Sequence, residues 1–141
     1  MTERSLVYVA GPLFDEGERW FMELLEARIV CAGFTTFLPH RDNPDKTADN
    51  CGEIYRNNVG AIERCDLVIA NLNGITTDDG TAWEIGYAVA KGTPVLGVFT
   101  DWRRRFDDEV VNLMLEESMD QIVRSLDELD DALASRTANA S

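Results

Sequence analysis

Short apolar segments alternate with amphipathic helical segments along this chain, and that alternation constrains its fold more than any other feature. Apolar runs predict five strands, at residues 6–10, 34–38, 67–71, 94–99 and 121–123. Apolar residues at helical spacing predict helices at residues 15–32, 53–64, 81–91, from 107 or 108 to 115, and 125–133. Short apolar strands joined by helices indicate a parallel sheet that helices cover on both faces.

This pattern predicts the α/β class, as a flavodoxin-like, doubly wound, three-layer sandwich with a five-stranded parallel sheet. The 141 residues suffice for one domain with its own core. We expect that domain to span residues 1–134, with a polar loop at 39–50 and a flexible C-terminal tail at 135–141. Ligands bind such sheets at the carboxyl ends of the strands, which here lie near residues 10–11, 38–39 and 71–79.

The net charge of −13, from 26 acidic and 13 basic residues, limits the classes of partner. Nucleic-acid binding depends on clustered Lys and Arg, so we expect no nucleic-acid partner. A dense acidic surface is expected of proteins in high salt, and is also found on ordinary acidic cytosolic proteins. The apolar run at residues 6–10 is too short for a signal peptide or a membrane span, which predicts a cytoplasmic protein. Three cysteines without Cys-x-x-Cys spacing favour neither disulfides nor a metal site.

Several common binding and catalytic motifs are missing from the sequence. Gly-x-Gly-x-x-Gly and Walker A patterns are absent, so we expect neither a dinucleotide nor a triphosphate cradle. A receiver domain would need an acidic pair after the first strand, where Ala10 and Gly11 stand. With His40 as the one histidine and no Gly-x-Ser-x-Gly elbow, we expect no Ser-His-Asp triad, and we interpret His40 as a loop residue. We interpret the arginine run at 103–105 as a solvated loop that pairs with the aspartates at 101, 107 and 108.

The segment from Asp78 to Glu84 joins the third strand to the third helix and is rich in carboxylates. Asp78 and Asp79 also suit simple helix capping, but Glu84 lies among apolar residues and is harder to explain as a surface residue. The positive end of a helix dipole is expected to keep such a carboxylate ionised. Glycosyl transfer needs one carboxylate to attack the anomeric carbon and another group for the leaving-group proton. Together with Tyr8 at the end of the first strand, this segment suits that chemistry.

The chain resembles the nucleoside 2-deoxyribosyltransferase family. The matching motifs are Val-Tyr-Val-Ala-Gly-Pro-Leu-Phe at 7–14, Cys-Asp-Leu-Val-Ile-Ala at 65–70, Asp-Asp-Gly-Thr-Ala-Trp-Glu-Ile-Gly-Tyr-Ala at 78–88, Gly-Thr-Pro-Val at 92–95 and Asn-Leu-Met at 112–114. The Asp-x-Gly-x-x-x-Glu-x-Gly-x-Ala pattern is the most specific of them. The resemblance implies a flavodoxin-like fold, dimers or hexamers, a deoxynucleoside and a nucleobase as substrates, and neither a metal nor an organic cofactor.

The resemblance also implies roles for single residues. Glu84 matches the nucleophile, Tyr8 the tyrosine that orients it, and Asp78 a pocket aspartate. Asn112 and Met114 match residues that a neighbouring subunit contributes to the pocket. The remaining substrate-binding positions are Gly11, Pro12, Asn58, Asp79 and Gly80. Asn58 departs from the family pattern, in which an aspartate implicated in protonating the leaving base often stands there, because an amide has no acidic proton to give.

The resemblance thus implies a nucleotide-salvage enzyme that transfers 2-deoxyribose between nucleobases through a covalent deoxyribosyl-glutamate, with retention. One alternative is a hydrolase that cleaves the N-glycosidic bond of deoxynucleosides or of their 5'-monophosphates. The residues from Gly11 to Glu16 are apolar and acidic, which favours nucleosides over nucleotides. A second alternative is a non-catalytic nucleoside sensor, which would not need the Glu84, Tyr8 and Asp78 combination.

Overall fold

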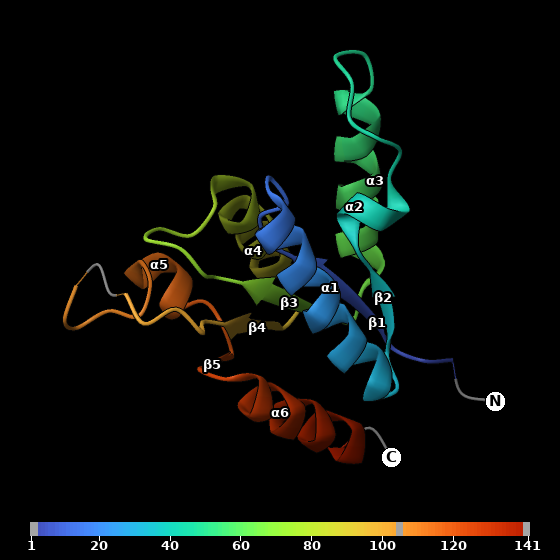
Figure 1. Cartoon of the computed structure of the whole chain (residues 1–141). Helices are drawn as coiled ribbons and strands as arrows, with labels where there is room; N and C mark the ends of the chain where they lie inside the picture. Colours follow the sequence, from blue (N-terminus) through green and yellow to red (C-terminus); the bar gives the residue numbers. More distant parts are fainter. Residues whose placement is uncertain (1–2, 104–105, 140–141) are drawn as a thin grey trace.

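One parallel sheet with the strand order β2-β1-β3-β4-β5 forms the centre of the molecule (Figure 1). The structure is a computed structural model and describes residues 3–103 and 106–139. Within these residues the strands are β1 (Leu6–Ala10), β2 (Thr35–Phe37), β3 (Leu67–Asn71), β4 (Val95–Val98) and β5 (Gln121–Val123). The helices are α1 (Glu16–Cys31), α2 (Pro39–Asp42), α3 (Cys51–Arg64), α4 (Asp79–Ala90), α5 (Leu113–Glu116) and α6 (Leu126–Asn139). The predicted α/β sandwich on a five-stranded parallel sheet is confirmed.

Helices cover both faces of the sheet because alternate strand residues point to opposite sides. On one face, α1 and α6 pack over Val7, Val9, Leu67, Ile69, Leu96 and Val98. On the other face, α3 and α4 pack over Tyr8, Ala10, Val68, Ala70 and Val95. Tyr8 therefore lies in an apolar layer beneath α3 and α4, and it is the direct register partner of Val68 on β3. Within the described residues, none of the helices is both long and apolar enough to cross a membrane.

The prediction of a helix that begins at residue 107 or 108 is wrong for the residues before 113. The helix α5 begins only at Leu113, because the Asn112 side chain accepts a hydrogen bond from the Met114 N–H and caps it there. The N–H groups of Val110 and Val111 instead donate to Glu116 Oε2. At Val110, Val111 and Met114, side-chain oxygens thus accept the N–H hydrogen bonds that backbone carbonyls would accept inside a helix.

The predicted loop at 39–50 and the predicted tail at 135–141 are each partly wrong. Residues 39–42 form the short helix α2, which has Pro39 in its first turn and whose Asp42 carboxylate accepts the Leu38 N–H. Residues 135–139 continue α6, where the hydroxyls of Ser135 and Thr137 donate to carbonyls one turn back. Residues 140 and 141 lie outside the described residues.

Candidate active site

Tyr8 and Glu84 meet beneath α4 at the centre of the sheet. The Tyr8 hydroxyl donates a hydrogen bond to Glu84 Oε2, joining β1 to α4. Tyr8 is fully buried, and its ring stacks on Phe37 with 5.5 Å between the ring centroids. Burial, followed by the nearby Glu84 charge, raises the pKa of Tyr8 well above its ordinary value, so this hydroxyl stays a donor. The arrangement fixes one oxygen of Glu84 and leaves the other for further contacts.

Burial decides the charge of Glu84. Removal from water raises the pKa of this carboxyl to about 7; the Tyr8 hydrogen bond opposes that rise and the negative charge of Asp78 adds to it. Both the protonated and the ionised form of Glu84 are therefore populated near neutral pH. The expectation that the helix dipole keeps this carboxylate ionised is wrong, because burial raises its pKa and because the dipole field has weakened in the second turn of α4.

Asp78 begins α4 and faces the same region. Its Oδ2 accepts hydrogen bonds from the Thr81 N–H at 2.9 Å and from the Thr81 hydroxyl at 3.0 Å, so the capping expected from the sequence is present. A Cβ on Gly80 would lie 3.3 Å from Asp78 Oδ2, so the small residue leaves this carboxylate room. Asp79 and Gly80 lie exposed in the first turn, where both line the cavity between α3 and α4 that Glu84 also lines.

Asp78 lines a cavity of about 380 Å³ at the carboxyl end of β1, here called the Asp78 cavity. Gly11 and Asn58, both predicted from the sequence, line it too, whereas Pro12 is buried behind it. A Cβ on Gly11 would lie 2.3 Å from Met22 Sδ, so the backbone can approach α1 only as glycine.

Sequence reasoning missed several residues of the Asp78 cavity. Arg19, His40, Asn43 and Lys46 line it, from the start of α1 and from the segment between β2 and α3. Asn43 Nδ2 donates to Asn58 Oδ1 at 2.7 Å, which holds the Asn58 amide with its own Nδ2 left as a donor. One sequence signal pointed to the segment between β2 and α3: residues 38–39 end a predicted strand, and ligands bind at the carboxyl ends of such strands.

Glu84 lines a second, more open cavity of about 510 Å³ between α3 and α4, here called the Glu84 cavity. Asn58 lines both cavities, so the two adjoin at this residue. Tyr55 and Trp83 form an aromatic wall, with ring centroids 5.8 Å apart. Glu84 thus lines an apolar, aromatic cavity that adjoins the Asp78 cavity at Asn58.

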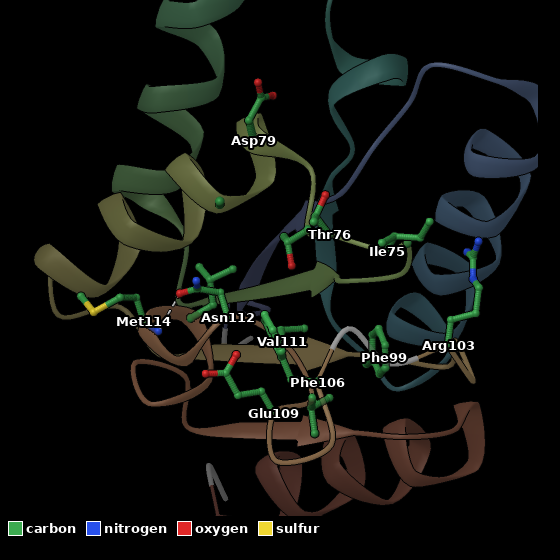
Figure 2. A pocket seen from close by; sticks show the side chains of 15 residues that line it. Ile75, Thr76, Asp79, Phe99, Arg103, Phe106, Glu109, Val111, Asn112 and Met114 are labelled. Atoms are coloured by element: carbon green, nitrogen blue, oxygen red, sulfur yellow. Dashed lines mark hydrogen bonds between the residues drawn. The ribbon is translucent and has the colours of Figure 1, made fainter.

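Asn112 and Met114 line a different cavity of about 410 Å³, between the loop after β3 and the segment before α5 (Figure 2). Apolar residues form much of its wall, among them Ile75, Phe99 and Val111. Tyr8, Asp78 and Glu84 do not line this cavity, so within one chain Asn112 and Met114 do not share a cavity with the nucleophile. The Met114 side chain is 73% exposed.

Comparison with known proteins decides the family. A sequence model described as nucleoside 2-deoxyribosyltransferase matches residues 7–118, which include all the strands but β5 and the helices through α5. The chain belongs to the nucleoside 2-deoxyribosyltransferase family. It is accordingly a member of a family of deoxyribosyltransferases that act on nucleosides.

Relatives of this nucleoside 2-deoxyribosyltransferase family member span bacteria and a protozoan. An uncharacterized protein of Ureaplasma parvum is 30% identical over 135 residues, covering 82% of this chain and 84% of its own. The 2-deoxyribosyltransferase of Leishmania mexicana is 26% identical, with a TM-score of 0.71 over 93% of this chain and 97% of its own.

Two further solved structures share the fold. The 2-deoxyribosyltransferase of Bacillus psychrosaccharolyticus has a TM-score of 0.79 at 22% identity, covering 89% of this chain and 90% of its own. The CMP N-glycosidase of Clostridium botulinum has a TM-score of 0.60 at 24% identity, covering 91% and 96% respectively.

Proposed function

We propose that this family member transfers 2-deoxyribose between nucleobases by double displacement with retention at C1'. The observation that carries the proposal is the partly buried Glu84, which bonds to the Tyr8 hydroxyl and opens on a cavity. A nucleophilic carboxylate must be held in one orientation and exposed to the sugar carbon, and this geometry supports both requirements.

In the first step, an oxygen of ionised Glu84 attacks C1' while the bond to the base nitrogen breaks. The electron pair of that bond goes to the base, which leaves with a proton, and deoxyribose stays on Glu84 as an ester. A second base then attacks C1' from the vacated face and releases the carboxylate. Water in place of the base gives slow hydrolysis. The proposed steps need neither a metal nor an organic cofactor.

Incubation with deoxyinosine and free adenine or cytosine tests the proposal, with the nucleoside products separated by chromatography. The wild-type protein should form the new deoxynucleoside, and the Glu84→Gln protein, which keeps the side-chain shape, should not. If deoxyinosine binds but neither exchange nor hypoxanthine release occurs, the chain is a nucleoside sensor rather than a transferase.

Hydrolysis of a deoxynucleoside 5'-monophosphate is the second candidate, and the Asp78 cavity supplies the observation in its favour. Arg19 and Lys46 line this cavity and are able to pair with a phosphate, while Asp45 and Asp78 in the same wall oppose an anion. The sequence segment after β1 favours nucleosides, so we propose that deoxynucleosides react faster. Faster cleavage of the monophosphate, with release of deoxyribose 5-phosphate, would favour the hydrolase.

We also propose that a neighbouring subunit completes the site with Asn112 and Met114, in a homodimer or a hexamer. The exposed fractions of Leu113 and Met114, 53% and 73%, support an apolar contact surface at this helix. Mixing inactive Glu84→Ala protein with inactive Asn112→Ala protein should restore activity, because a mixed oligomer regains one intact site. A fully active monomer by light scattering would contradict the shared site.

A further inference from the structure

The leaving base of the proposed reaction needs a proton that the residues named so far do not supply. Asn58 lies in the right cavity, but an amide is not a titratable acid, and its Oδ1 already accepts from Asn43. The Oδ2 of Asp78 accepts two hydrogen bonds from Thr81 as the cap of α4. The Tyr8 hydroxyl already donates its hydrogen bond to Glu84. Another group facing the Asp78 cavity is required for an acid-assisted departure.

His40 lies in the wall of that cavity together with Gly11, Asn58 and Asp78. Its side chain is 17% exposed, and its Nε2 lies 3.2 Å from Glu23 Oε1. Its Nδ1 is buried and has no hydrogen-bond partner among the described residues. A buried ring nitrogen without a partner costs free energy, so a ligand that bonds to it would be favoured there.

These contacts give His40 the features of a general acid. Imidazole is the side chain that most readily gains and loses a proton near neutral pH. With Nε2–H donated to Glu23, the ring is held in one orientation, and the buried Nδ1 remains without a partner among the described residues. No sequence motif indicates this role, because His40 and Asp78 are far apart along the chain and line one cavity only in the folded protein.

We propose that His40 protonates the leaving base, a role that rests on the proposed transferase function. As the bond between C1' and the base nitrogen breaks, its electron pair passes to the base, which takes the Nδ1 proton of the His40 imidazolium. In the same step Glu84 forms the bond to C1'. In the second half-reaction, neutral His40 takes the N–H proton of the incoming base and returns to its first state, so protons and charges balance over the cycle.

Two probe substrates distinguish an acid from a residue that only shapes the cavity. Hypoxanthine must be protonated as it leaves 2'-deoxyinosine, whereas 7-methyl-2'-deoxyguanosine is already cationic and releases a neutral base without a proton. Base release is measured in single turnover for wild type and His40→Gln. We expect the variant to lose about a hundredfold or more on deoxyinosine and less than about threefold on the methylated nucleoside. Retained cleavage of the second substrate also shows that the variant folds.

Lys46→Gln is the matched control, because Lys46 lines the same cavity without the Glu23 contact. The Lys46→Gln substitution should change the rate of base release from the two substrates by the same factor. Glu23→Gln should reproduce the selective loss in milder form. Equal losses on the two substrates, or no loss, in His40→Gln would overturn the proposal for His40 and leave the transferase intact. A wild-type protein that releases base from neither substrate would instead refute the proposed function itself.

Discussion

Replacing Glu84 with Gln should make the protein more stable at alkaline pH while it abolishes base exchange. The substitution keeps the shape of the side chain and an oxygen that can accept the Tyr8 hydrogen bond. It removes the carboxyl whose pKa burial raises from 4.5 to about 7. A catalytic carboxylate held in an apolar layer is thus expected to cost the native state stability, as strained functional groups do.

The magnitude follows from proton linkage. Between pH 4.5 and 7 the folded protein holds the Glu84 proton and the unfolded chain does not, so the free energy of unfolding falls as pH rises through this window. Each pH unit inside the window is worth about 1.4 kcal/mol, which makes the whole loss about 3 kcal/mol. Most of this loss falls between pH 5 and pH 8. Gln has no proton to lose, so the variant escapes this fall.

Urea denaturation of both proteins at pH 5 and pH 8 measures the effect. The free energy of unfolding of Glu84→Gln, relative to wild type, should rise by about 2–3 kcal/mol between the two pH values. Glu53→Gln, an exposed carboxylate on α3, is the matched control and should show no such change. A difference for Glu84→Gln that is independent of pH would refute the argument that burial holds this carboxyl protonated.

Three further outcomes follow from the same geometry. First, kcat/KM of the wild type should rise with pH on the acidic side of its profile, because attack needs ionised Glu84, and should fall again once the His40 imidazolium is lost; a profile flat from pH 5 to 8 would contradict this. Second, Tyr8→Phe should lower kcat by about one to two orders of magnitude with a smaller effect on KM. It should also move the acidic limb of the pH profile to higher pH, because the lost Tyr8 hydrogen bond lowers the Glu84 pKa in the wild type. An unchanged rate would mean that Tyr8 is only a core aromatic. Third, Gly11→Ala should destabilise the fold by about 1–3 kcal/mol in urea, since its Cβ would clash with Met22, whereas Gly17→Ala, with 3.4 Å to its nearest neighbour, should not; equal stabilities would disprove the clash.

The sheet could be predicted from the sequence because its central strands are almost wholly apolar, with Asn71 at the end of β3 as the polar exception. β1 and β3 are buried on both faces, and such runs leave few alternatives. The start of α5 and the end of α6 could not be predicted, because local polar residues there suit either a loop or a helix. Asn112 caps α5 at its start, and Thr137 lies within α6, where its hydroxyl donates to the Leu133 carbonyl.

The candidate site was predictable where its residues share a motif and unpredictable where they do not. The Tyr8 to Glu84 hydrogen bond expected from the family resemblance is present, while their catalytic roles stay predictions. The charge of Glu84 was misjudged, since a helix position says nothing of how much protein covers the carboxyl. His40 and Asn43 reach the Asp78 cavity only through the folding of the segment between β2 and α3, which has no sequence signature.

Trapping the covalent intermediate tests the central claim most directly. A deoxynucleoside with fluorine at C2' of the sugar should slow the breakdown of the glycosyl ester, so that the adduct accumulates and its peptide can be identified by mass spectrometry. We predict one deoxyfluororibosyl group per active site, attached to Glu84 and absent from the Glu84→Gln protein. Turnover of deoxyinosine by wild type together with an adduct on any other residue, or undiminished turnover by Glu84→Gln, would contradict the account.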